Sequence, residues 1–397
     1  MVYKAALLVA AAAAAVAALT TLSRDTTVMT AAVAPLVQLL KPASNAANSL
    51  ANSTTAPQRQ RWVQQISWEP RSYLFHGFLS DEEVAQIKTA AAPFMKRSTV
   101  VGDAKQHINV VDEYRTSYGM FIRRNNPLIT GIMKRVAEWA KLPVSHFEDM
   151  QVLRYGAGQQ YRPHQDSILD EVQQPHGPRL ATVLLYLNDV PEGGETAFPD
   201  TDASKWASPE VGAQVDPTLS ECAKGFVAYR PQKGDAFMFW SFKPDGVSMD
   251  PFAQHTGCPP TKGVKWAAPM WIHSRPFRPD TANAPHDPVE AVDPGVCEDV
   301  NPQCEQWAAS GACETNKAYM AGNVEHHGHC RKACGVCSVC ETDDRTCYEE
   351  NRRKQGYLVC TEDDELAVEF EEGRPVVREK QAAGRQGGCA AAGAACA

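Results

Sequence analysis

The cysteines of this chain lie mostly near its C-terminus, and this distribution limits how that part can fold. The chain has 397 residues and 13 cysteines, of which eleven follow residue 296. The stretch from Cys297 to Cys337 holds six of them, yet it is too short to bury a self-sufficient hydrophobic core. It therefore needs cross-links, and disulfide bonds persist in the secretory pathway rather than in the cytosol. The sequence predicts a small cross-linked C-terminal module in an oxidising compartment.

The N-terminus carries an apolar segment that fits the same compartment. Lys4 precedes an unbroken apolar run over residues 5–19, and Arg24 follows soon after it. Because the run is short and alanine favours membrane insertion only weakly, residues 1–22 are interpreted as a signal peptide or an uncleaved signal anchor. An Ala-rich buried helix is the structural alternative. An anchor predicts a single-pass type II protein of the endoplasmic reticulum or Golgi membrane, whereas cleavage predicts a lumenal or secreted one. Asn52 begins an Asn-Ser-Thr glycosylation motif.

Composition divides the remainder of the chain into segments. Residues 23–61 are rich in small polar residues and are predicted to form a stem. Residues 62–277 form the main domain, and the Pro-rich residues 278–296 link it to the cysteine-rich residues 297–337. Residues 338–397 are charged and then Gly/Ala-rich, so we expect them to be disordered. The net charge of −8 argues against a nucleic-acid partner.

The main domain shows helical patterns first and strand patterns later. Ser80 opens a capping-box sequence for a helix that ends before Pro93, and Asn126-Pro127 opens a second helix. Strand-like runs follow at residues 150–155, 180–187, 226–229, 236–240 and 266–272. This order predicts an α+β domain in which a β sandwich or barrel is backed by helices. Residues 193–196 (Gly-Gly-Glu-Thr) are interpreted as a tight turn that defines the fold rather than the chemistry.

Three residues have the pattern of an iron site. Two imidazoles and one carboxylate can hold Fe(II) on one face and leave other coordination positions open. His164 and Asp166 are two residues apart, so on extended backbone they project to the same side. Taken alone, this spacing also fits an ordinary polar loop. His255 is the candidate for the second imidazole, because the residues after it supply a further feature of such a site.

That further feature is Lys265, which lies inside an otherwise apolar strand pattern. A buried ammonium without a partner is costly. If 2-oxoglutarate chelates iron through its keto and adjacent carboxylate oxygens, its distal carboxylate would lie deep in the pocket and need such a cation. The alternative is a lysine on an edge strand that faces water.

Several blocks in the right order resemble the 2-oxoglutarate- and Fe(II)-dependent prolyl 4-hydroxylases, particularly the membrane-anchored plant and algal forms. The resemblance covers roughly residues 66–276. It rests on RTSYGMFIRR (115–124), QVLRYGAGQQYRPHQD (151–166), RLATVLLYLNDVPEGGETAFP (179–199), KGDAFMFWSFKPDG (233–246) and HTGCPPTKGVKWAAPMWIH (255–273). It implies a double-stranded β-helix (jelly-roll) core backed by helices. It also implies 4-hydroxylation of peptidyl proline with Fe(2+), 2-oxoglutarate, O2 and L-ascorbate.

The resemblance also implies roles for single residues. His164, Asp166 and His255 would be the iron ligands, and Lys265 with Tyr155 would hold the distal carboxylate of 2-oxoglutarate. Residues that would line the cosubstrate pocket or shape the peptide groove are Thr182, Tyr161, Arg179, Trp271 and Glu148. Tyr161 and Trp271 could instead be core aromatics, and Arg179 could cap its strand.

The chain departs from the family pattern beside the metal motif. Relatives usually carry aromatic residues on either side of the aspartate, whereas Gln165 and Ser167 are polar. The ligands are intact, so iron binding should survive, but the wall beside the peptide differs. Peptide preference is therefore less defined by the resemblance than the reaction type is.

The cysteines are expected to pair within their own regions. Cys222 and Cys258 are remote from the C-terminal cluster, so they pair with each other or remain buried thiols. The six cysteines of residues 297–337 resemble the sea-anemone potassium-channel-toxin-like (ShK) domain, which implies the pairs Cys297–Cys337, Cys304–Cys330 and Cys313–Cys334. Zinc is the alternative, with Cys334-x-x-Cys337 and nearby histidines as ligands. The unassigned cysteines are Cys340, Cys347, Cys360, Cys389 and Cys396.

The predicted function is a procollagen-type prolyl 4-hydroxylase acting on proline-rich, secreted or cell-wall proteins. One alternative is a dioxygenase that acts on another peptidyl residue such as lysine. The other is a catalytically inert binding protein that uses the cysteine-rich module for recognition. The sequence identifies no partner subunit.

Overall fold

The computed structural model describes residues 60–103, 108–167, 169, 176–279, 292–323, 327–371 and 374–380. The expected signal segment and nearly all of the stem with Asn52, most of the linker, Cys389 and Cys396 lie outside these ranges. Among the helices within them, none is long and apolar enough to cross a membrane.

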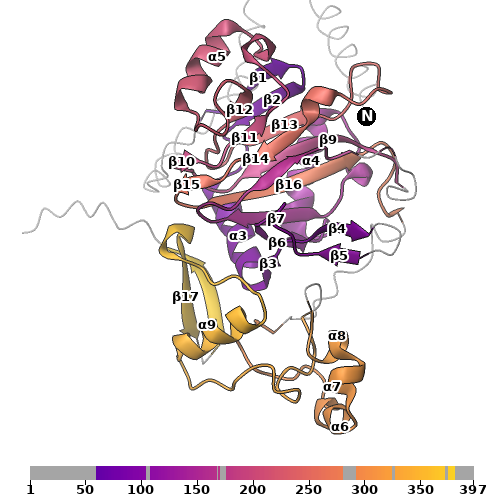
Figure 1. Ribbon diagram of the computed structural model, residues 1–397, viewed down its shortest axis with the longest axis vertical. Coiled ribbons are helices and arrows are strands. Elements are labelled where there is room, and N and C mark those ends of the chain that lie inside the picture. The colour runs from indigo at the N-terminus through magenta and orange to yellow at the C-terminus, as the bar shows by residue number, and fades with distance from the viewer. Residues whose placement is uncertain are drawn as a thin grey trace, which may run out of the picture. The chain divides into compact units, whose positions relative to one another are not determined.

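A large antiparallel sheet forms the centre of the main domain (Figure 1). It has eight strands in the order β1-β2-β13-β9-β16-β7-β6-β3. Their bounds are β1 Trp62–Trp68, β2 Arg71–His76, β13 Ala236–Trp240, β9 Arg179–Tyr186, β16 Lys265–His273, β7 Met150–Tyr155, β6 Tyr118–Ile122 and β3 Lys96–Arg97. The long central strands are the ones that the sequence predicts.

A smaller antiparallel sheet faces the large one. Its order is β12-β11-β14-β8, with bounds Val227–Tyr229, Thr196–Phe198, His255–Gly257 and Tyr161–His164. Buried apolar side chains from both sheets, among them Tyr186, Phe198 and Phe237, form one core cluster between them. The two facing sheets confirm the jelly-roll class of fold. Two short strand pairs accompany them: β10 (Glu192–Gly193) with β15 (Pro260–Lys262), and β4 (Val100–Asp103) with β5 (Ile108–Val110).

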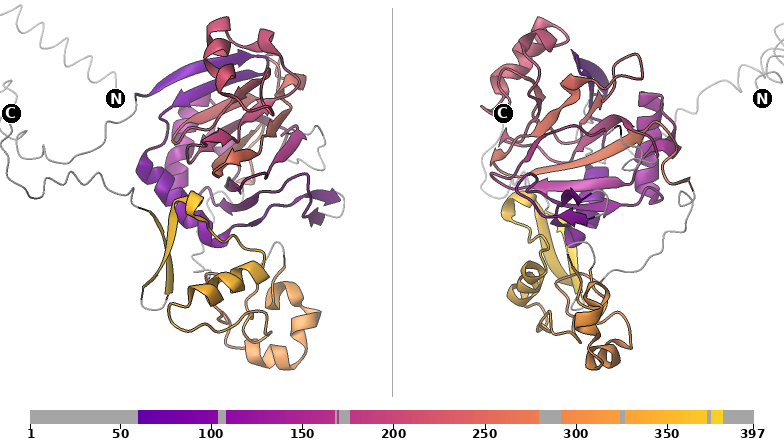
Figure 2. Two further views of the ribbon diagram at one scale, coloured as in Figure 1. Left: turned by 60° about the vertical axis from the view of Figure 1, so that its left-hand side comes forward. Right: turned by 45° about the vertical axis from the view of Figure 1, so that its right-hand side comes forward.

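Two helices cover the other face of the large sheet (Figures 1 and 2). Helix α3 (Asp81–Ala91) begins with the expected capping box between Ser80 and Glu83, and α4 (Pro127–Ala140) begins after the cap residue Asn126. Their apolar faces join a large buried cluster with alternate residues of β7, β9 and β16. A shorter helix, α5, spans Pro209–Val215.

Strand β16 shows how this arrangement builds the site. Successive side chains of a strand point to opposite faces. Trp266, Ala268, Met270 and Ile272 belong to the helix-side core, whereas Lys265, Ala267, Pro269 and Trp271 line a pocket between the two sheets. Lys265 therefore faces the inside of the jelly roll rather than water.

The cysteine-rich module consists of short helices tied together by disulfide bonds. The helices are α6 (Cys304–Ala309), α7 (Ala312–Thr315) and α8 (Lys317–Met320). The bonds join Cys297 to Cys337, Cys304 to Cys330 and Cys313 to Cys334. These are the pairs that the ShK resemblance implies. Because all six sulfurs form disulfides, none of them is a zinc ligand in this structure.

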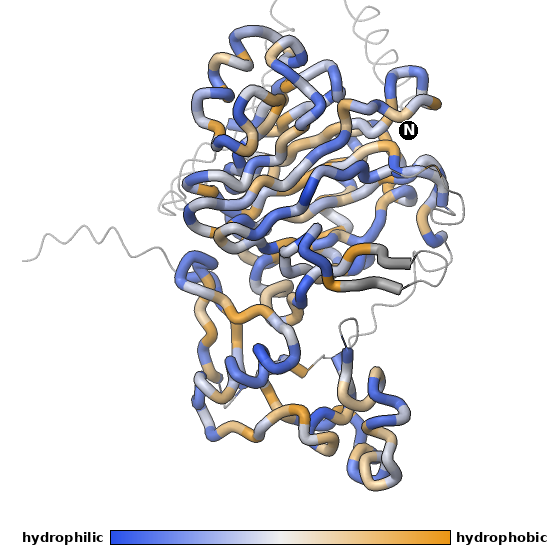
Figure 3. The backbone as a smooth tube through the Cα atoms, viewed as in Figure 1, coloured by the Kyte–Doolittle hydropathy of each residue, from blue (hydrophilic) through white to orange (hydrophobic). Residues whose placement is uncertain are grey.

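The segment after Cys337 differs from the disordered tail that its composition predicts. It forms a disulfide between Cys340 and Cys347, helix α9 (Arg345–Lys354) and a hairpin of β17 (Leu366–Glu371) and β18 (Arg374–Glu379). Apolar stretches are present in this segment (Figure 3), and Leu358 and Leu366 are buried in the helix-side core of the main domain. The segment can fold because its few apolar residues pack on that domain as well as on each other.

Candidate active site

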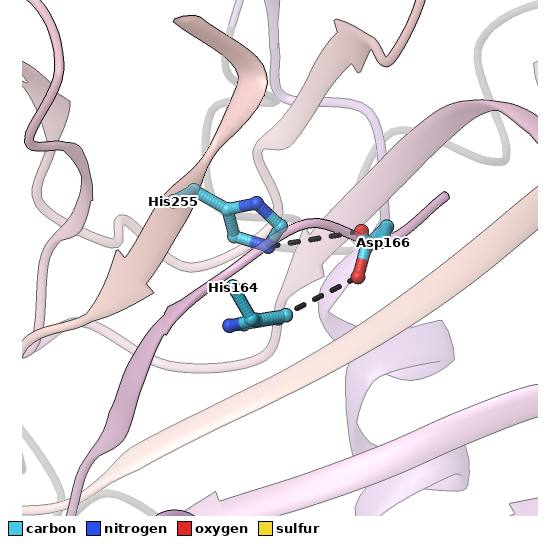
Figure 4. Close-up of side chains that lie close together, drawn as sticks. All are labelled: His164, Asp166 and His255. Atoms are coloured by element: carbon cyan, nitrogen blue, oxygen red, sulfur yellow. Dashed lines mark ion pairs between the residues drawn. The ribbon is translucent and has the colours of Figure 1, made fainter. Parts of the chain in front are cut away.

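His164, Asp166 and His255 come together beside the smaller sheet, where Asp166 lies two residues after β8 (Figure 4). His164 ends β8 and His255 begins β14, and these two residues are directly paired across the antiparallel strands. Asp166 Oδ1 lies 3.5 Å from His164 Nε2, and its Oδ2 lies 3.7 Å from His255 Nε2. All three ligand atoms lie within 4.8 Å of one another. Among the described residues, this is the only such group of three histidine, cysteine or acidic side chains.

The hydrogen bonds around the histidines prepare them to bind a metal. His164 Nδ1 lies 2.8 Å from the carbonyl oxygen of Arg162, and His255 Nδ1 lies 3.1 Å from that of Ala253. A carbonyl only accepts, so each Nδ1 carries the proton and each Nε2 keeps its lone pair for the centre. Two imidazoles and one carboxylate with open positions fit Fe(II).

The charges of the three residues agree with that role. Burial raises the pKa of the Asp166 carboxyl, but nearby His255 and His164 outweigh burial, so its pKa lies well below the usual range. Burial lowers the pKa of His255 to about 4 despite the attraction of Asp166. Asp166 is thus ionised and His255 neutral at neutral pH, which are the states that bind a divalent metal. Thr182 Oγ1 also donates a hydrogen bond to Asp166 Oδ2 over 2.6 Å.

Lys265 is a buried cation in the same pocket. It is 4% exposed, and the structure shows no ion pair for it within the described residues. Its Nζ lies 3.5 Å from Thr196 Oγ1 and 5.7 Å from the ring centroid of Tyr155. Burial lowers the pKa of Lys265 to about 7, although the charge of Glu195 opposes that shift. An anion that reached this ammonium would bind tightly and restore its charge.

One pocket contains nearly all of the residues that the sequence singled out. Its lining includes the three candidate ligands, Lys265 and the predicted residues Tyr155, Thr182, Tyr161 and Trp271. The ring of Tyr161 stacks on that of His164, with their centroids 3.6 Å apart. Desolvation raises the pKa of the Tyr161 hydroxyl to about 12.

Arg179 and Glu148 lie beside this pocket and form an ion pair with two hydrogen bonds. Arg179 Nε donates to Glu148 Oε1 over 2.6 Å, and Arg179 Nη2 donates to Glu148 Oε2 over 3.1 Å. His273 Nε2 lies 2.7 Å from Glu148 Oε1. The guanidinium lies 4.0 Å from the ring centroid of Trp271. Arg179 is therefore fixed by Glu148 against a wall of the pocket, which is a different role from capping its strand.

The polar residues that depart from the family pattern have unsatisfied groups. Gln165 Oε1, Ser167 Oγ and Trp271 Nε1 are buried and have no hydrogen-bond partner in the protein. Buried polar groups are normally paired. These three atoms, together with Nε of the pocket residue Arg115, are thus groups near the site that a bound ligand or water could satisfy.

Thr196 and Tyr186 lie close to Lys265 but were not predicted from the sequence as site residues. Thr196 lines the pocket, and Tyr186 Oη donates to Thr196 Oγ1 over 3.0 Å, with the Tyr186 ring centroid 5.8 Å from Lys265 Nζ. Thr196 follows the two glycines of the turn at 193–194, which led us to interpret the whole motif as structural. Its position at the start of β11, on the sheet that carries the ligands, is the signal that would have identified it.

Comparison with known proteins defines the class to which this site belongs. Residues 150–273 match the 2OG-Fe(II) oxygenase superfamily, and this range contains all three candidate ligands and Lys265. Residues 296–337 match the ShK domain-like family. The protein is thus an oxygenase-fold chain with an ShK-like module.

Individual relatives narrow the class to a family. Probable prolyl 4-hydroxylase 4 of Arabidopsis thaliana is 38% identical over 291 residues, which cover 73% of this chain and 93% of the relative. Prolyl 4-hydroxylase 2 of the same plant is 40% identical over 277 residues, covering 69% and 88%. The chain belongs to the prolyl 4-hydroxylase family. A solved viral collagen prolyl hydroxylase from Paramecium Bursaria Chlorella virus-1, in a 2OG complex, is 25% identical, covers 51% of this chain and 94% of its own, and has a TM-score of 0.35.

Proposed function

We propose that this protein is an Fe(II)- and 2-oxoglutarate-dependent prolyl 4-hydroxylase that modifies peptidyl proline in secreted, proline-rich proteins. The observation that carries the proposal is Lys265, a buried ammonium without a carboxylate partner in the pocket of the three metal ligands. An iron site alone fits many oxygenases, whereas an added buried cation fits a cosubstrate with a second carboxylate.

In this proposal, separate groups of residues would bind the metal, the cosubstrate and the peptide. His164, Asp166 and His255 would hold the iron, which supplies the oxidising chemistry when O2 and 2-oxoglutarate are bound. Lys265 would pair with the distal carboxylate of 2-oxoglutarate, and the neighbouring Tyr155 would add a hydroxyl donor.

A second group of residues would shape the peptide side of the pocket. Tyr161 and Trp271 line the pocket, and the pair of Arg179 and Glu148 is packed against the Trp271 ring. Thr182 would keep Asp166 oriented toward the metal through its hydrogen bond. Enclosure between the two sheets would keep bulk water away from the reacting centre.

The disulfide bonds support the proposed compartment. Five disulfide bonds among the described residues support an oxidising lumen, in the endoplasmic reticulum or Golgi. An N-terminal anchor at residues 1–22 and glycosylation at Asn52 belong to the same proposal. Ascorbate would serve as the reductant for iron that is oxidised in turnovers without a peptide.

Turnover on peptides tests the proposal. The enzyme with Fe(II), 2-oxoglutarate and ascorbate is incubated with collagen-like and hydroxyproline-rich cell-wall peptides, and succinate is measured. We expect succinate release that requires a proline-containing peptide, with hydroxyproline detected by mass spectrometry. Release that depends on lysine peptides would assign another dioxygenase activity. No release with any peptide would refute the proposal.

A further inference from the structure

The two residues expected to anchor 2-oxoglutarate, Lys265 and Tyr155, are next to a second pair of residues whose side chains are buried on the opposite face of the sheet. On the antiparallel strands β7 and β16, Lys265 is paired with Tyr155, and Trp266 is paired with Arg154. Because side chains alternate, Lys265 and Tyr155 face the pocket, while Trp266 faces the helix-side core and Arg154 points the same way. Arg154 is 7% exposed and Trp266 is fully buried.

A single carboxylate from the C-terminal segment holds both residues of this second pair. Arg154 Nε donates to Asp364 Oδ1 over 2.9 Å, and Arg154 Nη2 donates to Asp364 Oδ2 over 3.0 Å. Trp266 Nε1 donates to Asp364 Oδ1 over 2.8 Å. Asp364 itself is fully buried and ends the short 3-10 turn η7 (Glu362–Asp364), where Thr361 N donates to its Oδ2.

Further contacts fix the segment that carries Asp364. Arg352 of α9 donates to the carbonyl oxygens of Ala92 and Pro93, just after α3. Lys88 of α3, which is fully buried, lies 3.6 Å from a carboxylate oxygen of Glu365. The segment is thus attached to the main domain by buried charges as well as by apolar packing. Removal of such a buried partner leaves an uncompensated charge.

We propose that Asp364 is a positioning residue for the cosubstrate, acting through Arg154 and Trp266. The inference rests on the proposed function, because it concerns the anchor of 2-oxoglutarate. Lys265 begins β16 and Tyr155 ends β7, so they form the last pair of their ladder. Strand ends fray unless something holds them. The Asp364 carboxylate ties together the adjacent pair, one residue inside that end, and so fixes where the ammonium and the phenol project.

Ligand affinity tests this role without relying on turnover. The binding of 2-oxoglutarate and of oxalate is measured by calorimetry on the full chain loaded with Mn²⁺. Oxalate can chelate the metal but has no distal carboxylate to reach Lys265. Asp364→Asn should weaken 2-oxoglutarate binding about tenfold, the low end of what loss of an outer partner costs. Its affinity for oxalate should stay within about twofold, because His164 and His255 lie on the smaller sheet, Asp166 follows β8, and none of the three contacts Asp364.

A neighbouring variant serves as the matched control. Asp363→Asn makes the same chemical change one residue earlier, at an exposed position, and should change neither affinity. If Asp364→Asn fails to fold, Thr361→Val removes a milder support, since the Thr361 hydroxyl contacts both Asp364 and Arg154. Thr361→Val should then weaken the binding of 2-oxoglutarate more than the binding of oxalate.

The outcomes separate this inference from the proposed function. The inference is overturned if the folded Asp364→Asn protein binds 2-oxoglutarate as tightly as wild type. If only Thr361→Val folds, an unchanged 2-oxoglutarate affinity in that variant overturns it. An equal loss for both ligands would also overturn it, because general loosening would explain it. Lys265→Ala is measured alongside. If Lys265→Ala does not weaken 2-oxoglutarate binding, the proposed anchor itself is wrong.

Discussion

Replacement of Lys265 by methionine should stabilise the free protein while it destroys cosubstrate binding. Burial holds the pKa of this ammonium at about 7 in place of its ordinary 10.5. At about 1.4 kcal/mol per pH unit, that difference corresponds to a cost of about 5 kcal/mol for keeping the charge in the folded protein. Methionine fills similar space without charge, and imperfect packing offsets part of the gain. We expect the free energy of unfolding at pH 7 to rise by roughly 2–4 kcal/mol.

The pH dependence gives the sign of this effect. The folded-state pKa lies below the unfolded value, so the cost is fully present below about pH 7 and disappears as the pH rises toward 10.5. Denaturant unfolding of the metal-free protein at pH 6.5 and at about pH 9.5 should therefore show a large and then a small difference between Lys265→Met and wild type. Lys262→Met, at an exposed position on β15, is the control and should change stability little at either pH.

Two results would refute this reasoning. One is a Lys265→Met protein that is less stable than wild type at pH 6.5. The other is a stabilisation that is equal at both pH values, because it would arise from packing and not from the buried charge. Retained 2-oxoglutarate affinity in the variant would show in addition that the ammonium does not anchor the cosubstrate.

Three more expectations concern the same pocket and its frame. Binding of 2-oxoglutarate at pH 8 should take up roughly one proton per site, because Lys265 with a pKa of about 7 regains its charge beside a carboxylate. Calorimetry in buffers of different ionisation enthalpy should then give different binding heats. Equal binding heats in all buffers would contradict the prediction. Cys222→Ala with Cys258→Ala should lower stability by about 3 kcal/mol, measured by denaturant unfolding; an unchanged midpoint would contradict a stabilising disulfide. Gln165→Tyr should change the ranking of peptide substrates more than the affinity for 2-oxoglutarate, and the reverse result would place Gln165 with the cosubstrate.

Local patterns were enough to predict the central strands and to single out His164, Asp166 and Lys265 as candidate site residues. His164 and Asp166 lie on one short extended stretch, and Lys265 is conspicuous in an apolar strand, so each signal is contained in a few neighbouring residues. The helix starts at Ser80 and Asn126 were equally local, since capping depends on side chains next to the first turn.

The packing of the C-terminal segment on the main domain could not be predicted from the sequence. Composition gave the segment after Cys337 the character of a disordered tail, because its few apolar residues, among them Leu358 and Leu366, stand in a charged and then Gly/Ala-rich stretch. They become buried only when the main domain supplies the partner surface. The pair of Arg154 and Asp364 joins residues 210 positions apart, and no local pattern connects them.

Isotope labelling during turnover tests the central claim most directly. The full chain is given Fe(II), 2-oxoglutarate, a proline-rich peptide and ¹⁸O2, and both products are analysed by mass spectrometry. The proposed function predicts one labelled oxygen in succinate and one in hydroxyproline, in equal amounts, and neither product from His255→Ala. Succinate without labelled hydroxyproline, label on another residue, or full activity of His255→Ala would contradict it.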